Sequence, residues 1–550
     1  MQKHLLHVVA VSLLLLAACA PVTKAPPAPA AGLPPAAAAA DPPWQLEWAR
    51  GAVFYEVFVR SFADSDGDGI GDLRGLAAKL DYLNDGRPGQ GSDLEVDGLW
   101  LMPVFASPSY HGYDVTDYRQ VNPDYGSEAD LRRLCEEAHR RGLKVIVDLM
   151  INHTSDRHPW FLDSRGGPSS PKRDWYIWRA DDPGWTQPWG GQNRTWHPYR
   201  GEYYYGLFWS GMPDLNFRNP EVRREVEQIA EFWLARGVDG FRLDAARHIV
   251  EAGPGQGQAG SAETHAYWRE FSRFVRRTNP RALLVGEVWS DPATVAEYFG
   301  STDTLPGGDE LPMNFDFDLA GAIVEAAKGG TAEPVRGSLE RVAAVYPPGV
   351  LDAPFLTNHD MVRVATQLAN DAARLRSAAA VLLTVPGTPF VYYGEEVGMQ
   401  NGPERRDEDK RMPMAWDGSP TGGFTSGVPW HPLAPGHAEA NVAAHAGPES
   451  LLARYRALIR ARHGSAALRA GSLALLDAPA GVLAFVREAG SERVLVAHNL
   501  GSAAVEFATG DVTGTAAEAL FADSGAAISR AGAAWRATLP PGASAAWLLR

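Results

Sequence analysis

The chain has 550 residues, of which 45% are hydrophobic and 21% are charged, so it has the composition and length of a globular protein with a large domain and a smaller one. Its formal net charge is −15, and no run rich in Lys or Arg stands out. This charge argues against a nucleic-acid partner and against charge-driven binding to anionic membranes.

The first 18 residues have the features of a targeting segment. Lys3 and His4 open a short positive region, and residues 8–16 form an apolar run too short to serve as a mature membrane span. The segment ends in Leu-Ala-Ala-Cys19, which resembles the bacterial lipobox and implies cleavage before Cys19 and lipidation of its thiol. The alternative is a plain secretory signal that contains a cysteine. The lipobox predicts an exported protein that is lipid-anchored to the bacterial cell envelope, periplasmic or associated with the outer membrane.

Residues 19–43 form an Ala/Pro-rich tether that cannot build a core and would hold the following domain away from a membrane. Cys135 is the other cysteine of the chain, so lipidation of Cys19 would leave no intrachain disulfide. Cys135 stands on an apparent helix, and we expect it to be a small buried hydrophobic residue.

From residue 53 onward, apolar strand-like runs alternate with amphipathic helical segments. Helix starts are indicated by a Ser127/Asp130 capping pattern and by Asn219 before Pro220. This alternation predicts an α/β fold, a (β/α)8 TIM barrel built from residues 44–153 and 217–465. A doubly wound sheet is the alternative, but polar residues recur where several strands end, and in a barrel those ends meet at one mouth. The predicted strands are 53–62, 96–104, 142–153, 238–245, 282–289, 313–318, 353–360 and 387–396.

Two regions depart from the alternation. Residues 154–216, after the third strand, are rich in Trp, Tyr, Gly and Pro and predict a small irregular inserted domain (domain B) beside the mouth. Residues 466–550 consist of short apolar runs between Gly/Ala/Ser turns, which predicts a C-terminal antiparallel β-sandwich domain.

Charged residues gather at the ends of the predicted strands. Buried charges cost several kcal/mol each unless they are paired, so a core gains nothing from collecting them without a use. One Arg-x-Asp pair alone is better explained as a structural ion pair, but several such strand ends together predict a catalytic site. The residues are Asp148, Asn152 and His153 after strand 3, Arg242 and Asp244 in strand 4, Glu287 in strand 5, and Asn358, His359 and Asp360 in strand 7.

The segments "DGLWLMPV", "DLMINH", "MPDLN", "GFRLDAARH", "GEVW", "FLTNHD" and "GTPFVYYGEE" occur in this order. Over essentially residues 50–550 the chain therefore resembles the α-amylase family, glycoside hydrolase family 13. The resemblance implies that Asp244 is the nucleophile, Glu287 the general acid/base, and Asp360 a third carboxylate that binds hydroxyls of the reacting sugar. It also implies that the scissile sugar is surrounded by Tyr113, Asp114, His153, Arg242 and His359.

Retaining cleavage of a glycoside needs an ionised nucleophile close to a protonated acid. Arg242 beside Asp244 should favour the carboxylate, whereas Glu287 in the apolar "LLVGEVW" should have a raised pKa because of desolvation. His153 and His359 could instead be satisfied core histidines.

The sequence predicts one or two structural calcium sites. The loop "DSDGDGIGD" imitates the first half of an EF-hand, but Gly75 stands where the twelfth-position Glu is required. The same loop resembles a calcium site of oligo-1,6-glucosidase-like relatives, with a solvated acidic turn as the alternative. Its ligands would be Asp64, Asp66, Asp68, the Ile70 carbonyl and Asp72. A second Ca²⁺, which would pin the insertion to the barrel, is implied by the family resemblance of Asn152, Asp214 and the His248 carbonyl.

Together the motifs predict a retaining α-glucan hydrolase that cleaves α-1,4 bonds in starch, maltodextrins or related oligosaccharides by double displacement. "MPDLN" and the acidic loop lean towards neopullulanases and oligo-1,6-glucosidases, whereas "DAARH" leans towards α-amylases, with Arg247 on the leaving-group side. Trp175, Trp185, Trp189, Trp196 and Trp209 are candidates for stacking on sugars.

The alternatives are an exo-acting α-glucosidase or oligo-1,6-glucosidase, a transglycosylase of the same family, and a non-catalytic glucan-binding lipoprotein. The complete set of Asp244, Glu287 and Asp360 argues against the last of these. The expected partners are the α-glucan and, through the lipid anchor, a membrane; the sequence implies no protein partner.

Overall fold

The computed structural model describes residues 41–303, 305–510, 512, 514–532 and 534–550, and residues 41–550 form one compact unit. The predicted signal peptide, Cys19 and the tether up to residue 40 lie outside the described residues. No helix in the described part of the chain is both long and apolar enough to pass through a bilayer.

At the centre of this unit the described residues form an eight-stranded parallel sheet, which confirms the predicted (β/α)8 fold. Apart from Lys144 and Asp352, which are half-buried, these strand residues are all buried, as expected where helices cover a parallel sheet. In spatial order the strands are β12 (Leu351–Ala353), β11 (Met313–Phe315), β10 (Leu283–Gly286), β9 (Gly240–Leu243), β5 (Lys144–Leu149), β2 (Gly98–Leu101), β1 (Phe54–Val57) and β13 (Phe390–Tyr392).

The two end strands of this sheet meet and close the barrel. A parallel bridge joins Phe355 to Phe390, and the backbone N–H of Thr388 donates to the carbonyl of Asp352 at 2.8 Å. The seventh strand was predicted at 353–360, yet β12 shares only Ala353 with that range. Pro354 has no N–H to donate to a ladder, so regular pairing stops there and the following residues form a loop at the mouth.

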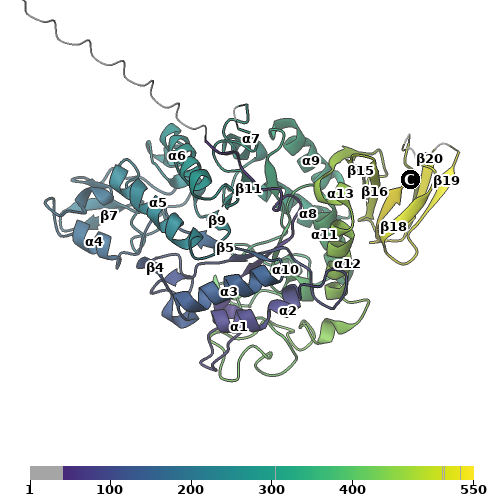
Figure 1. Ribbon diagram of the computed structural model, residues 1–550, viewed down its shortest axis with the longest axis horizontal. Helices are drawn as coiled ribbons and strands as arrows, with labels where there is room; N and C mark the ends of the chain where they lie inside the picture. The colour runs from purple at the N-terminus through teal and green to yellow at the C-terminus, as the bar shows by residue number, and fades with distance from the viewer. Residues whose placement is uncertain (1–40, 304, 511, 513, 533) are drawn as a thin grey trace, which may run out of the picture. The chain divides into compact units, whose positions relative to one another are not determined.

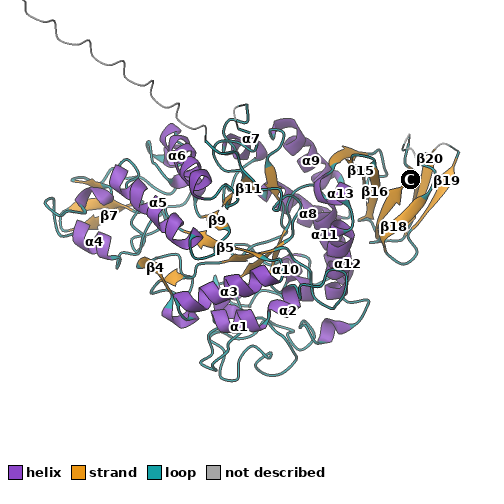
Figure 2. Ribbon diagram, in the orientation of Figure 1, coloured by secondary structure: helices purple, strands orange, loops and turns teal. Residues whose placement is uncertain are grey.

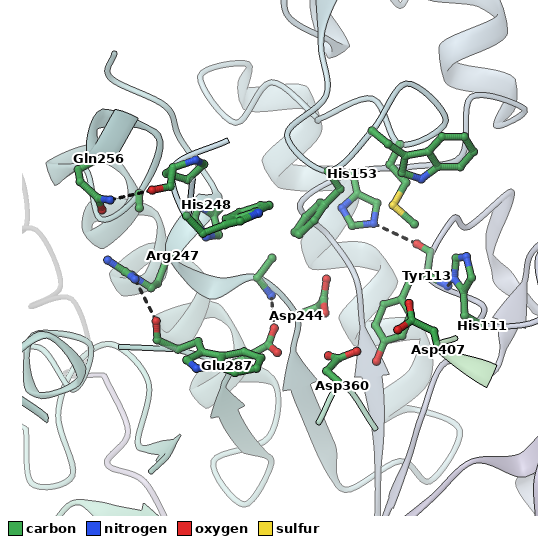
Figure 3. A pocket seen from close by; sticks show the side chains of 18 of the residues that line it. His111, Tyr113, His153, Asp244, Arg247, His248, Gln256, Glu287, Asp360 and Asp407 are labelled. Atoms are coloured by element: carbon green, nitrogen blue, oxygen red, sulfur yellow. Dashed lines mark hydrogen bonds between the residues drawn. The ribbon is translucent and has the colours of Figure 1, made fainter. Parts of the chain in front are cut away.

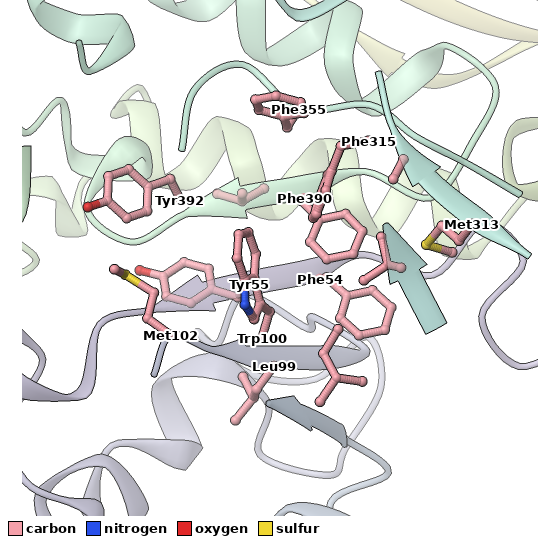
Figure 4. Packing of buried hydrophobic residues seen from close by; sticks show 14 of the residues in the cluster. Phe54, Tyr55, Leu99, Trp100, Met102, Met313, Phe315, Phe355, Phe390 and Tyr392 are labelled. Carbon is pink, nitrogen blue, oxygen red and sulfur yellow. The ribbon is translucent and has the colours of Figure 1, made fainter. Parts of the chain in front are cut away.

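Aromatic side chains fill the inside of the barrel (Figure 4). Phe54 and Phe390 stack with their ring centres 4.8 Å apart, and Trp100 lies 5.2 Å from Phe315. The barrel is therefore a packed core and not a channel.

Helices surround the strands (Figures 1 and 2). The capping box of Ser127 and Asp130 and the Asn219 cap before Pro220 are both present as predicted, and Cys135 is buried. The helices are α1 (Leu73–Ala78), α2 (Leu80–Leu83), α3 (Glu128–Arg140), α5 (Pro220–Leu234), α6 (Ala262–Thr278), α7 (Pro292–Glu297), α8 (Phe317–Gly329), α9 (Glu333–Val345), α10 (Val364–Gln367), α11 (Ala372–Thr384) and α12 (Leu451–His463).

The region between β5 and α5 contains its own small sheet. A short helix, α4 (Pro159–Ser164), precedes the antiparallel strands β6 (Trp178–Arg179), β8 (Glu202–Tyr205) and β7 (Trp196–Tyr199). Before β5, the strands β3 (Phe105–Ala106) and β4 (Asp117–Val121) pair in the loop that carries Tyr113.

After the barrel, α13 (Ala466–Ala470) leads into two antiparallel sheets, as predicted for the C-terminal region; they appear in yellow in Figure 1. Their described strands pack around buried residues such as Trp535 and Trp547. The first sheet has the order β14 (Ser472–Leu475), β15 (Val482–Ala489), β16 (Glu492–Asn499), β21 (Ser544–Leu549), β18 (Ala517–Ala522), and the second has β17 (Val505–Ala508), β20 (Ala534–Leu539), β19 (Ala527–Ala531).

Residues 41–50 form a strap across the base of the barrel, where the strands begin. Asp41, which lies within the range predicted for the tether, pairs with Arg273 and Arg277 near the end of α6 at 2.8 and 2.6 Å. The indole of Trp44 donates to the carbonyl of Gly308, before β11, at 2.9 Å. The strap therefore lies at the opposite end of the strands from the predicted site.

Candidate active site

A cavity of about 720 Å³ lies at the carboxyl ends of the barrel strands (Figure 3). Asp244, Glu287 and Asp360 lie side by side in its floor, with Tyr113 and His111 towards one end and Arg247, His248 and Gln256 towards the other. Its further lining residues are His153, Pro188, Trp189, Phe208, Trp209, Met212, Ala245, Ala259, Trp289, Asp407 and Arg411.

Arg242 links the carboxyls beneath the cavity. Its Nη1 donates to Asp148 Oδ1 at 2.8 Å and to Asp244 Oδ1 at 2.7 Å, and its Nη2 lies 2.8 Å from Glu287 Oε1. The prediction paired Arg242 with Asp244 alone. The structure shows that it contacts the acid/base candidate as well, because β9 lies between β5 and β10 in the sheet.

Burial dominates the electrostatics of the two central carboxyls. Desolvation raises the pKa of Asp244 above its ordinary value, and Arg242 opposes that rise without cancelling it. Desolvation likewise raises the pKa of Glu287, again against Arg242, in the direction predicted from the sequence. The second oxygen of Glu287 accepts a hydrogen bond from the backbone N–H of Ala245 at 3.0 Å, which fixes the carboxyl next to Asp244.

Asp360 is held in the opposite state. Its oxygens lie 2.8 Å from Arg411 Nη2 and 3.1 Å from His359 Nε2. Burial alone would raise the pKa of Asp360, but the charge and hydrogen bond of His359, with Arg411, outweigh it and hold the pKa well below the usual range. Asp360 therefore stays ionised beside the two carboxyls whose pKa values are raised.

His359 does not line the cavity but lies directly under Asp360. Its Nδ1 is 2.6 Å from Glu56 Oε1 and its Nε2 is 2.6 Å from the hydroxyl of Tyr113, whose ring stacks on the imidazole. Burial lowers its pKa, but Asp360 and Glu56 outweigh that and raise the pKa to about 9. His359 is thus a buried cation that positions Asp360 and Tyr113.

The other predicted sugar-binding residues divide into two groups. Tyr113, His153 and Arg247 line the cavity, and His153 Nε2 lies 3.1 Å from the carbonyl of Tyr113. Asp114 and Arg242 do not line it. Asp114 accepts a hydrogen bond from Ser107 at 2.8 Å and so holds the loop that carries Tyr113.

Sequence reasoning missed Arg411, Asp407, Trp289 and Glu56. Glu56 gave the same signal as Arg242, a charge inside an apolar strand, and could have been found. Arg411 and Asp407 stand in an irregular segment after β13, where neither periodicity nor a motif distinguishes them from surface charges. Only the fold brings them to the cavity.

The acidic loop of residues 64–72 offers a donor set that fits calcium. Carboxylate oxygens of Asp64, Asp66 and Asp72 lie within 4.8 Å of one another. Asp64 and Asp72 also accept backbone N–H groups of their own loop, and Asp72 caps α1. Asp68 accepts the N–H of Ile70 at 2.8 Å and is not in that group. Oxygen donors in a turn of this kind suit Ca²⁺.

Asn152, Asp214 and the His248 carbonyl also converge, where the insertion meets the barrel. Asn152 Nδ2 donates to that carbonyl, while its Oδ1 lies 3.1 Å from His153 Nδ1. Because His153 Nε2 must donate to the carbonyl of Tyr113, Nδ1 of the neutral ring is an acceptor. If the Asn152 amide is rotated by a half-turn, its NH2 group donates to His153 Nδ1 and its Oδ1 points towards the His248 carbonyl and Asp214. These three oxygens fit a cation.

Comparisons with known proteins agree with this geometry. A sequence model described as "Alpha amylase, catalytic domain" matches residues 56–471. The chain is 40% identical over 459 residues to Alpha-amylase 3 of Dictyoglomus thermophilum, covering 82% of this chain and 85% of that protein. It is 34% identical over 517 residues to an oligo-1,6-glucosidase of Parageobacillus thermoglucosidasius, covering 82% and 90%. The crystal structure of an α-amylase from H. orenii superposes with a TM-score of 0.82 at 40% identity, over 91% of this chain and 99% of that one.

Proposed function

The chain belongs to the α-amylase family, and we propose that it cleaves α-1,4-glucosidic bonds with retention of configuration. It is a glycoside hydrolase of the kind that hydrolyses α-glucans or transfers their sugars. Asp244 is the nucleophile and Glu287 the general acid/base. The substrates are starch, maltodextrins or related oligosaccharides.

The observation that carries this proposal is the bridging of Asp244 and Glu287 by one guanidinium, that of Arg242. Two carboxyls on the same guanidinium are held close together, as a retaining mechanism requires. An inverting mechanism needs roughly 6.5–9.5 Å between them to admit a water molecule.

In the first step, protonated Glu287 gives its proton to the glycosidic oxygen while Asp244 attacks the anomeric carbon and forms an ester. In the second step, the Glu287 carboxylate takes a proton from water, and the oxygen of that water displaces Asp244. Ionised Asp360 accepts hydrogen bonds from hydroxyls of the reacting sugar, and Tyr113 offers its ring to the same sugar.

Calcium would be held by Asp64, Asp66 and Asp72, and a second ion by Asn152, Asp214 and the His248 carbonyl. Neither ion would take part in the reaction; each would stabilise the segment that holds it. For the N-terminal segment, we propose export and lipid attachment at Cys19, which metabolic labelling with a palmitate analogue would test against a Cys19→Ala variant.

Replacement of Asp244 by Asn tests the mechanism. We expect hydrolysis of maltotriose to fall by at least about a thousandfold, because the ester cannot form, while the midpoint of thermal unfolding changes little. Proton NMR of the first products should show the α-anomer from the wild type. An initial β-anomer, or full activity in the Asp244→Asn protein, would contradict the assignment.

A product time course on soluble starch, pullulan, maltotriose and isomaltose separates the members of this family. Cleavage of starch to mixed oligosaccharides supports the α-1,4-glucan hydrolase. Release of glucose alone, or faster cleavage of isomaltose, would instead favour an exo-acting glucosidase. Binding of starch without any product would favour a glucan-binding protein.

A further inference from the structure

Three tryptophans that line the cavity are more than half exposed to solvent. Trp189 is 55% exposed, and Trp209 and Trp289 are each 52% exposed, yet all three line the cavity. By contrast, Trp175 and Trp196, which were also stacking candidates, are buried in the insertion. Large aromatic side chains left in water around a concave site suit a ligand with apolar faces.

Trp189 is exposed, yet it also packs against neighbouring side chains. Its ring stacks on that of Phe208, with 5.8 Å between centres, and meets the ring of His248 edge-on at 5.8 Å. The carbonyl of the preceding Pro188 accepts a hydrogen bond from Gln256 Nε2 at 3.0 Å. Contacts from both the insertion and the barrel therefore hold the indole in place. The rest of the ring remains exposed at the cavity, where a ligand can cover it.

Trp189 lies at a defined end of the cavity. The general acid must stand next to the leaving-group oxygen, so the leaving group extends from Glu287 away from Asp360. In that direction lie Arg247 and His248, and Arg247 Nη1 donates to the carbonyl of Trp289 at 3.0 Å (Figure 3). Because Trp189 contacts His248, it belongs to this end and not to the end formed by Tyr113 and Asp407.

We propose that Trp189 is a specificity-determining platform on which a sugar of the leaving group stacks. This inference rests on the proposed function of Asp244 and Glu287. The preferred substrate is then an α-glucan with further sugars on the leaving-group side of the scissile bond. A glucoside with a small leaving group that carries no sugar is disfavoured.

The same platform receives the acceptor in the second half of the reaction. When a sugar in place of water occupies it, a hydroxyl of that sugar attacks the anomeric carbon of the ester on Asp244. Glu287 takes the hydroxyl proton, the bond to Asp244 breaks, and a new glucosidic bond forms. Trp189 thus favours transfer to sugars over hydrolysis when acceptor is abundant.

The test compares two substrates that share their non-reducing part. The leaving group of maltopentaose consists of sugars. The leaving group of α-maltosyl fluoride is fluoride, so this substrate places no sugar on the leaving-group side. For Trp189→Ala, we expect the ratio of kcat/KM on maltopentaose to kcat/KM on the fluoride to fall roughly three- to tenfold. Trp189→Phe should lose less, because a smaller ring still stacks. With maltose added as acceptor, the ratio of transfer to hydrolysis products should fall in the same order.

Leu162→Ala serves as the matched control. This side chain is also exposed and also in the insertion, on α4, but it does not line the cavity. Its ratio should equal that of the wild type. An unchanged ratio for Trp189→Ala in an active enzyme would overturn the inference and leave the proposed function intact. A wild type that cleaves neither substrate would overturn both.

Discussion

Arg242 supplies one positive charge to the carboxyls of Asp148, Asp244 and Glu287, and it is 1% exposed. One guanidinium cannot balance three ionised carboxylates in a buried site, so at least one proton is retained among them near neutral pH. Burial raises the pKa of Asp148 to about 7 and raises that of Glu287 as well. The proton needed for catalysis is thus shared within a network, not stored on an isolated acid.

The pH profile follows from these shifts. Activity requires Asp244 without its proton and Glu287 with it. Because both pKa values are raised, we expect both limbs of the kcat/KM profile on maltotriose to lie above the ordinary values of 3.8 and 4.5. A group with a raised pKa keeps its proton to higher pH, so the alkaline limb moves towards neutrality.

α-Maltosyl fluoride provides the control for this profile. Its fluoride leaves with much less help from an acid, so the alkaline limb should weaken or disappear, while the acid limb from Asp244 persists. Identical profiles on the two substrates would show that the alkaline limb does not report Glu287.

The loop of residues 64–72 contains carboxylates that hold its own backbone and one that is available to a metal. Asp64 and Asp72 accept backbone N–H groups, so their removal would damage the loop with or without a cation. Among the described residues, Asp66 accepts only the N–H of Asp68, at 3.3 Å, and its side chain is otherwise available to a metal. We therefore expect a chelator to lower the midpoint of thermal unfolding of the wild type by several degrees and to have less effect on Asp66→Ala.

Asp81→Ala is the matched control for that experiment, because Asp81 is an exposed carboxylate on the neighbouring helix α2. It should respond to the chelator as the wild type does. Equal chelator sensitivity in Asp66→Ala and the wild type would place the calcium elsewhere.

Elements with a strong local signal were predictable, and those set by tertiary contacts were not. The order of strands and helices follows from alternating apolar periodicity, and the caps of α3 and α5 follow from their residue types. The extent of β12 could not be found, because "APFLTNHD" is apolar enough for a strand, yet Pro354 and the closure with Phe390 end the pairing. The role of Arg411 depends on a contact with Asp360, 51 residues away in sequence, which no local pattern encodes.

The C-terminal sheets share a hydrophobic core with the barrel. Phe485 and Val494 belong to the same buried cluster as the barrel strands. Arg487 of β15 donates to the carbonyl of Thr384 at the end of α11, at 2.7 Å. The two parts are therefore expected to unfold together.

Removal of residues 466–550 should leave a barrel that does not fold, because it exposes the apolar face that β15 and β16 cover. The milder change Phe485→Ala should lower the free energy of unfolding by about 3–5 kcal/mol. Circular dichroism should show a single transition, and activity should be lost at that same transition. Ile528→Ala, in β19 of the second C-terminal sheet, should lower the free energy of unfolding much less. Two separate transitions would show that the C-terminal region is an independent unit.

The strap of residues 41–50 has a practical consequence. Asp41 and Trp44 fasten the start of the described unit at the base of the barrel, whereas the cavity opens where the strands end. Material joined ahead of residue 41, such as a bead or a fused scaffold, meets the catalytic unit at the end where no sugar enters. Immobilisation through the N-terminus should accordingly preserve access for a polymer as large as starch.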